Sequence, residues 1–224
     1  AVQRGELDIL QLQCLIDARG SVNMTMPSGA TPLLVASQLG DLEVAQCLVS
    51  FQANVNCKDN HGANPVYYAV LAGHAKLLEF LLSVNVDANA GESGKGFLVH
   101  VAIRSKNHQV LQILLDGKAD PDVAQMNGDT PLCLAIGVDC ARILQLLTKA
   151  AANPNKPGTC FSLPISLAAS TCKHQPMFLL IKASASIAKA RRNEFPLMWQ
   201  AALSNNRTAL CCLGKFKAVF SKVE

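Results

Sequence analysis

A 33-residue period is the feature that most constrains how this chain of 224 residues can fold. Alanine recurs at that spacing at six positions and leucine at seven. The alanines are Ala36, Ala69, Ala102, Ala135, Ala168 and Ala201, and the leucines are Leu15, Leu48, Leu81, Leu114, Leu147, Leu180 and Leu213. A unit this small does not bury its own apolar face, so neighbouring units must stack and shield one another. The period therefore predicts an elongated solenoid whose long surface suits binding better than catalysis.

Composition agrees with one continuous array. Half of the residues are apolar but only 5% are aromatic, which indicates a core of alanine, leucine, valine and isoleucine. No linker or charge block divides the chain, and no apolar run approaches the roughly 18 residues that a membrane span needs. Nine cysteines are an odd number in a chain too large to need disulfides, so we expect a soluble, cytoplasmic protein in a reducing compartment. Because the chain begins within a repeat, we expect it to be part of a longer protein.

The second unit shows the local pattern most clearly. Thr31 is placed to cap a first helix, and Pro32 follows at the first helical position, where its missing N–H costs nothing. Gly40 is expected to end that helix in a left-handed conformation, and Asp41 to begin a second helix. The second helix then carries an apolar stripe at helical spacing. Its members are Leu42, Val44, Ala45, Leu48 and Val49.

At these residues the chain resembles the ankyrin repeat, whose signature runs Gly-x-Thr-Pro-Leu-His-x-Ala, then Gly-His, a Leu-Leu pair and Gly-Ala-Asp-Val-Asn. Several parts of the signature recur in one phase. They include Pro32, Pro65, Pro131 and Pro164; Gly29, Gly62 and Gly128; Gly40 and Gly73; and Asn23, Asn56, Asn89 and Asn155. The resemblance implies an all-α ankyrin-repeat solenoid of stacked antiparallel helix pairs, with inter-repeat hairpin loops and about seven repeats.

The period also sets the expected repeat boundaries within a single array over residues 1–224. They are a partial first repeat at 1–25, repeats at 26–58, 59–91, 92–124, 125–157 and 158–190, and a degenerate capping repeat at 191–224. The signature departs in three places. The first unit lacks its turn and first helix, and in the fourth unit Phe97-Leu98 replaces Thr-Pro and Lys106 replaces the glycine between helices. It erodes again from Thr159 onward, so we expect an irregular carboxyl-terminal face.

Catalytic and cofactor chemistry finds little support. The glycine-rich segment 91–96 lacks the first glycine and the hydroxyl residue of a phosphate-binding loop, because Asn89 and Gly96 stand there instead. Cys57 with His61, and Cys172 with His174, lack the second pair that would complete a tetrahedral metal site. His74 and His100 resemble hydrogen-bonding histidines that support the fold. We therefore expect no enzyme activity, no cofactor, no metal and no small-molecule substrate.

The resemblance places partner recognition on a concave face formed by the hairpin tips and the exposed side of the first helices. The predicted partner-binding residues are Asn60, His61, Leu71, Arg104, Met126, Asn127, Asp129 and Arg192. Apolar and arginine side chains are the best anchors there, although Leu71 and Met126 would equally suit core packing. Ser37 and Gln38 are also expected on that exposed side. Tyr67 and Tyr68 adjoin it, and one of them is expected between repeats. The predicted function is a non-catalytic protein–protein interaction module within a larger scaffold or adaptor.

Two further expectations accompany this interpretation. In the family, an asparagine eight residues after the helix leucine and preceded by valine can be hydroxylated by a cytosolic dioxygenase, and Asn23 and Asn56 match that spacing. The alternative is that these side chains stabilise the turn. The second expectation starts from a net charge of +4 and a cluster of basic residues near the carboxyl end. That end, including Lys215 and Lys217, offers an alternative function as a regulatory segment that packs within the parent protein or on an anionic membrane. Nucleic acid binding is not expected, because aromatic residues are not interleaved with the basic ones.

Overall fold

The computed structural model describes residues 21–86, 98–158, 162–170, 174–183, 191–192 and 195–196, together with residues 201, 202, 207, 210, 211 and 213. It divides the chain into two compact units, Ala1–Asp120 and Pro121–Glu224. Side chains are described for all of these residues except 174, 175, 191, 192, 195 and 196.

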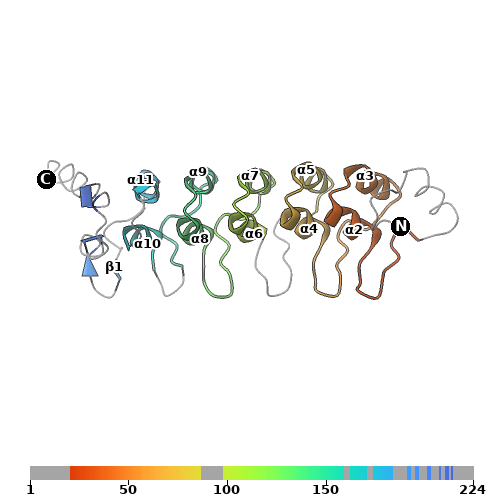
Figure 1. Ribbon diagram of the computed structural model, residues 1–224, viewed down its shortest axis with the longest axis horizontal. Coiled ribbons are helices and arrows are strands. Elements are labelled where there is room, and N and C mark those ends of the chain that lie inside the picture. The colour runs from red at the N-terminus through yellow and green to blue at the C-terminus, as the bar shows by residue number, and fades with distance from the viewer. Residues whose placement is uncertain are drawn as a thin grey trace. The chain divides into compact units, whose positions relative to one another are not determined.

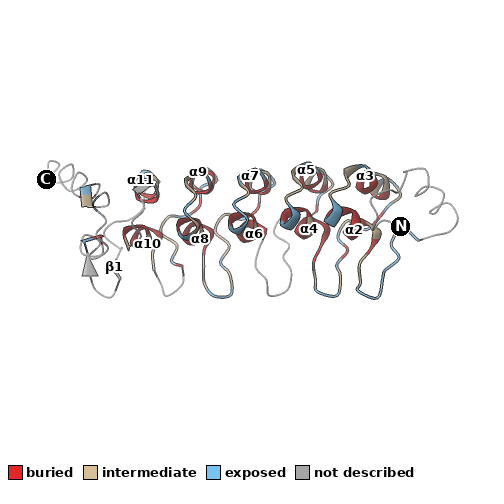
Figure 2. Cartoon of the chain, viewed as in Figure 1, coloured by how far each residue is buried: buried red, intermediate tan, exposed pale blue. Residues whose placement is uncertain are grey.

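Unit 1 is a stack of three helix pairs (Figure 1). The pairs are α2 (Pro32–Leu39) with α3 (Leu42–Ser50), α4 (Pro65–Ala72) with α5 (Ala75–Ser83), and α6 (Leu98–Arg104) with α7 (His108–Asp116). The first helices α2, α4 and α6 pack side by side in one layer, and the second helices α3, α5 and α7 pack in another. The faces that meet between the layers are buried (Figure 2).

Unit 2 repeats the same arrangement. Its described helices are α8 (Pro131–Val138) with α9 (Ala141–Lys149), and α10 (Pro164–Ser170) with α11 (His174–Lys182). Helix α8 packs against α10, and α9 packs against α11. A short antiparallel pairing of β1 (Arg191–Arg192) with β2 (Phe195–Pro196) follows.

The periodic alanines and leucines occupy equivalent buried places in both units. All six alanines are fully buried, at 0% exposure. The described leucines from Leu48 onward are 0 to 4% exposed. This confirms the all-α ankyrin-type fold. Close packing of helix pairs requires a small residue where the helices approach closely and a larger residue between the layers.

The first helices begin as the sequence predicts. Thr31 accepts a hydrogen bond from the N–H of Leu34, Asn64 from Tyr67 and Thr130 from Cys133, and a proline follows each cap. These side chains satisfy amides that have no partner within the helix. Asp41 caps the second helix α3 in the same way, accepting from Val44 at 2.9 Å.

A left-handed residue ends each of the four described first helices that lead directly into a second helix. Gly40 and Gly73 have φ of 77° and 80°, while Lys106 and Asp139 adopt φ of 55° and 60° at the equivalent positions. The loss of glycine in the fourth repeat therefore leaves the backbone path unchanged. Its cost is the strain of a side chain in the left-handed region.

One expectation is wrong: Ser37 is fully buried rather than exposed. Its hydroxyl donates to the Leu33 carbonyl oxygen at 2.7 Å, so the side chain is satisfied within its own helix. Other expectations lie outside the described residues. They concern the glycine-rich segment 91–96, Asn89, residues 1–20 of the partial first repeat, Lys215, Lys217 and the side chain of Arg192. The repeat boundaries remain a prediction.

Candidate partner-binding surface

The described loops before α2, α4 and α8 are tight hairpins of one design. Met26 donates its N–H to the Ala30 carbonyl at 2.9 Å, and the equivalent bonds join Asp59 to Ala63 at 3.1 Å and Gln125 to Asp129 at 2.9 Å. Each tip turns at a glycine, Gly29, Gly62 or Gly128, with φ of 79°, 82° and 86°. Such backbone bonds and left-handed glycines give each hairpin a defined shape. Residues on the tips are therefore presented in fixed positions.

Asn60 joins two neighbouring hairpins in unit 1. Its N–H donates to the Ser28 carbonyl at 3.2 Å, and its Nδ2 donates to the Pro27 carbonyl at 2.9 Å. A side chain at Gly29 would place its Cβ 2.5 Å from Asn60 Oδ1, so the glycine is required by this approach as well as by its φ. The Asn60 side chain thus holds hairpin spacing, a role that the sequence pattern did not reveal.

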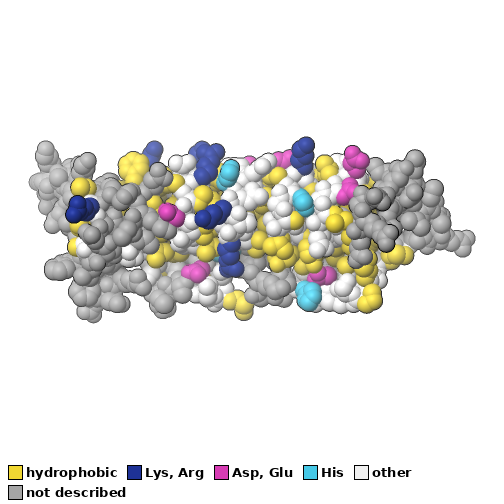
Figure 3. Space-filling view, in the orientation of Figure 1, with side chains coloured by type: hydrophobic (Ala, Val, Ile, Leu, Met, Phe, Trp, Pro, Cys, Tyr) yellow, Lys and Arg dark blue, Asp and Glu magenta, His cyan; other side chains and the backbone are white. Residues whose placement is uncertain are grey.

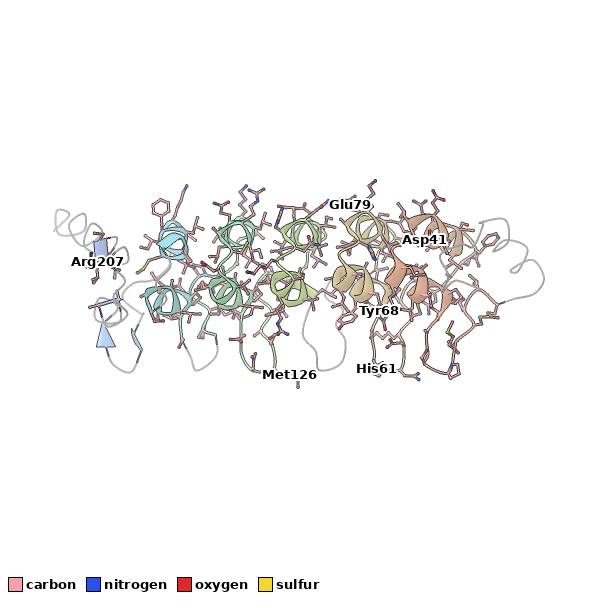
Figure 4. The ribbon with its side chains drawn as sticks, viewed as in Figure 1. Asp41, His61, Tyr68, Glu79, Met126 and Arg207 are labelled. Carbon is pink, nitrogen blue, oxygen red and sulfur yellow. The ribbon has the colours of Figure 1, made fainter. Side chains whose placement is uncertain are left out.

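Asp59 organises the hairpin that carries the exposed His61. Its Oδ1 accepts from the N–H of His61 at 2.8 Å and of Ala63 at 3.0 Å, and its Oδ2 accepts from the Tyr68 hydroxyl at 2.6 Å. Partial burial works to raise the pKa of Asp59, but these hydrogen bonds outweigh it and hold that pKa below its ordinary value. Figure 4 shows Tyr68 on the hairpin side of α4 and His61 at the hairpin tip.

Two predicted binding residues lie on adjacent first helices. Leu71 on α4 and Arg104 on α6 occupy equivalent repeat positions, and these two helices pack together. Leu71 is 54% exposed, and Arg104 is exposed too. Tyr67 is buried and meets Tyr68 edge to face, with ring centroids 5.8 Å apart, as expected for one member of the pair.

The described hairpin of unit 2 carries three of the predicted residues. Met126 stands at its tip with 94% of its surface exposed, and Figure 4 shows it projecting away from the helices. Asn127 donates from Nδ2 to Asp129 Oδ2 at 2.9 Å, and its Oδ1 accepts from the Asp129 N–H at 3.0 Å. The polar pair fixes the tip, and the methionine extends beyond it. The backbone of Arg192 lies in β1.

Comparisons with known proteins agree with this geometry. The family model for ankyrin repeats in three copies matches residues 1–92, and the single ankyrin-repeat model matches residues 127–158. The chain belongs to the ankyrin-repeat family. Ankyrin repeats are in general non-catalytic modules of protein–protein interaction. The comparison with curated proteins found no match.

Solved ankyrin-repeat structures share the fold. An ankyrin repeat domain from Acinetobacter baumannii is 25% identical, with a TM-score of 0.76 over 83% of this chain and 96% of that domain. The human ASB11 ankyrin repeat domain is 24% identical, with a TM-score of 0.72 over 95% of each chain. The second likeness shows the fold alone.

The ankyrin-repeat surface of unit 1 also contains exposed apolar side chains that sequence reasoning missed. Met24, Met26 and Leu39 are 57%, 44% and 45% exposed. Apolar surface is visible over the first helices and hairpins of this unit in Figure 3. The available signal was the phase: Met26 precedes Asp59 by 33 residues and so belongs to a hairpin, and Leu39 is the last residue before the junction glycine. Contiguous exposed apolar surface is typical of interaction sites, whereas single exposed apolar side chains are common on any protein.

One asparagine and one aspartate, at equivalent positions of the ankyrin-repeat loops, link successive repeats. Asn23 Oδ1 accepts from the N–H of Asn54 at 2.7 Å. Asp122, at the equivalent position in unit 2, accepts from the N–H of Asn153 at 2.8 and 3.0 Å. These contacts support a stabilising role for the side chain. Hydroxylation of Asn23 and Asn56 stays a prediction.

Buried cysteines in this ankyrin-repeat chain support packing. Cys57 Sγ lies 3.1 Å from Thr31 Oγ1, and Cys133 lies on α8 beneath the loop that contains Gly158. Burial raises the pKa of both thiols, and it outweighs their hydrogen bonds. Both groups are therefore held as neutral thiols at neutral pH. Within the described residues, no three metal-ligating side chains gather, and no helix is long and apolar enough to cross a membrane.

Proposed function

We propose that this chain binds a peptide segment or a partner domain through its hairpin tips and the exposed ends of its first helices. The carrying observation is that Leu71 and Met126, which the sequence left open as core residues, are 54% and 94% exposed on ordered elements. Because the helix and the hairpin that carry these anchors are already formed, their backbone loses little conformational entropy when a partner covers them.

The polar residues near these anchors orient the hairpin tips. Asn60, His61, Asn127 and Asp129 lie on the hairpins, and their hydrogen bonds define where the tips stand. We assign to Arg104, at the repeat position of Leu71 on the adjacent first helix, the recognition of an acidic group next to an apolar one, and to Arg192 the same function in unit 2. The proposed setting is a larger scaffold or adaptor protein in the reducing cytoplasm, which the cysteine content favours.

Site-specific photo-crosslinking tests the proposal. A photo-reactive amino acid is placed at position 71 or 126, with Gln109, exposed on α7, as the control position. We expect a shared crosslinked protein from positions 71 and 126 that position 109 does not label. After purification of that protein, Leu71→Asp should weaken its binding about 10-fold, or roughly 1.4 kcal/mol. Equal labelling from all three positions, or unchanged affinity in a folded Leu71→Asp variant, would contradict the proposal.

A further inference from the structure

The second helices α9 and α11 of unit 2 carry an exposed aromatic side chain with basic residues around it; we call the face that they form the outer face of the unit. Phe178 on α11 is 61% exposed, and Lys182 follows it one helical turn later. Lys149 on the neighbouring helix α9 occupies the same repeat position as Lys182, and α9 packs against α11. Arg142 lies two turns before Lys149 on the same face of α9. We call Arg142, Lys149, Phe178 and Lys182 the outer patch.

Both helices of the outer patch lack acidic residues. Neither Ala141–Lys149 nor His174–Lys182 contains an aspartate or a glutamate. The acid nearest in sequence is Asp139, which lies before α9 at the left-handed end of α8. In Figure 3, Lys and Arg side chains gather over α9 and α11 beside apolar surface. The three cations therefore present a positive field around the phenyl ring.

The position of Phe178 is polar in the repeats that contain α3, α5, α7 and α9, and it is Cys211 in the last repeat. The polar equivalents are Gln46, Glu79, Gln112 and Gln145. Figure 4 shows Glu79 on the outer side of α5. A phenylalanine with most of its surface exposed contributes little to the packing of its own unit and leaves apolar area in water. The fold therefore does not account for an aromatic residue at this place.

We propose that the outer patch binds an acidic protein segment in which an apolar residue is flanked by carboxylates. The apolar residue would cover Phe178, while the flanking carboxylates meet Lys149 and Lys182, with Arg142 reaching an acid further along. Aromatic anchors within a complementary charged rim are typical of peptide binding. Membrane binding by a helix requires a stripe of several exposed apolar residues. On the described parts of α9 and α11, Phe178 is the only large apolar side chain that is strongly exposed.

The test uses the whole chain and a fluorescent synthetic peptide with one phenylalanine between glutamates in a glycine–serine background. Binding is followed by fluorescence anisotropy. Two control peptides replace the glutamates by glutamine, or the phenylalanine by alanine. The protein variants are Lys149→Glu with Lys182→Glu, and Phe178→Ser. Lys76→Glu is the matched control, because Lys76 is exposed at the repeat position of Arg142 but lies beside Glu79 in unit 1.

We expect the acidic peptide to bind the native chain, and each outer-patch variant to weaken binding at least 10-fold while Lys76→Glu changes it less than 2-fold. Circular dichroism establishes that each variant keeps its helices; if the double reversal unfolds, Lys149→Gln with Lys182→Gln replaces it. Absent binding, equal loss in Lys76→Glu, or equal binding of the glutamine peptide would overturn the proposal. Phosphatidylserine vesicles form a separate arm: vesicle binding that needs Phe178 and the lysines, without peptide binding, would assign the patch to a membrane instead.

Discussion

The two units bury residues at the same repeat positions, and they differ where side chains contact solvent or a neighbouring repeat. In unit 1 the second helices α3, α5 and α7 carry charges of both signs, with Glu43, Lys76, Glu79 and Asp116. In unit 2 the described second helices α9 and α11 carry basic residues and no acidic ones. The alanines and leucines of the core stay constant between units because every helix pair closes the same space. Function therefore has room to differ on surfaces that the repeat leaves unconstrained.

The junction between paired helices shows the same contrast at atomic scale. In unit 1, a Cβ added to Gly40 would lie 2.5 Å from the His74 ring, and one added to Gly73 would lie 3.0 Å from Asn107. In unit 2, Asp139 carries a side chain at the equivalent left-handed position. The backbone conformation is common to the junctions, but the close approach of the next repeat makes glycine necessary at Gly40.

Transferring the unit 2 residue into unit 1 should give the largest effect. Gly40→Asp adds left-handed strain and forces the His74 ring away, which also lengthens the 3.3 Å contact between His74 Nε2 and the Gln38 carbonyl oxygen. We expect a loss of about 2 to 3 kcal/mol in the free energy of unfolding, measured by urea denaturation. The double variant Gly40→Asp with His74→Ala should recover part of it. A Gly40→Asp loss below about 0.5 kcal/mol would show that the two junctions are equivalent after all.

The inter-repeat acceptors allow a direct comparison of the units. The charged carboxylate of Asp122 accepts from one N–H through both of its oxygens, whereas the neutral amide oxygen of Asn23 accepts a single hydrogen bond. We expect Asp122→Ala to cost about 1.5 kcal/mol and Asn23→Ala about 0.7, since charge-assisted hydrogen bonds are roughly twice as strong. Thermal unfolding of both variants checks the order. Equal losses would mean that charge adds nothing at these exposed sites.

Acid should weaken unit 1 through a contact that unit 2 lacks. The folded state lowers the pKa of Asp59, so its stabilising contribution is complete at neutral pH and is lost as pH falls through that lowered value, from about pH 4 downward. The equivalents of Asp59 and Tyr68 in unit 2 are Gln125 and Leu134, which do not titrate. Amide hydrogen exchange at Ala63 should rise between pH 5 and pH 3 more than exchange at Gly128, whose N–H donates to the Gln125 carbonyl oxygen at 2.8 Å.

Tyr68→Phe is the control for this acid effect. It removes the hydroxyl that donates to Asp59 and should cost about 0.5 kcal/mol at neutral pH, because the carboxylate is largely exposed. It should also reduce the pH dependence at Ala63. An unchanged pH profile in Tyr68→Phe, or an equal acid effect at Gly128, would contradict the assignment to Asp59.

The smallest effect should come from the reverse exchange, Asp139→Gly. Removing a side chain from a left-handed residue with φ of 60° relieves strain, so we expect a gain of about 0.5 kcal/mol. Ala151→Gly, also at φ of 60°, is a second example without a charge change. Urea denaturation measures both. Destabilisation by both variants would show that backbone freedom outweighs left-handed strain at these positions.

Much of the fold was predictable because the residues that begin and end each helix act through contacts within a few residues of the chain. Thr31 with Pro32, Gly40 and Asp41 each act within a few residues of chain, and the structure places them as a cap, a left-handed end and a second cap. Lys106 and Asp139 were harder to interpret. Their residue types do not predict a left-handed conformation, yet both residues adopt it at the position that glycine occupies in the second and third repeats.

The candidate surface was predictable only in outline. Phase assigned Asn60 and Met126 to hairpins, but it did not show that Asn60 bonds to Pro27 of the preceding hairpin, or that Met126 stays almost fully exposed. Ser37 was assigned to the wrong side because a serine on a first helix looks solvent-facing. Its hydroxyl is satisfied by the Leu33 carbonyl, which removes the cost of burying it.

By itself, the sequence determined the period, the helix pairs, their caps and the alanine and leucine core, because these follow from hydrophobic spacing and from hydrogen bonds within a few residues. The tertiary structure alone decided which side chains of neighbouring repeats touch, such as His74 against Gly40 and Asn23 against Asn54. Such contacts join atoms about one repeat apart, and their existence depends on how closely neighbouring helices approach, a distance that no local pattern encodes.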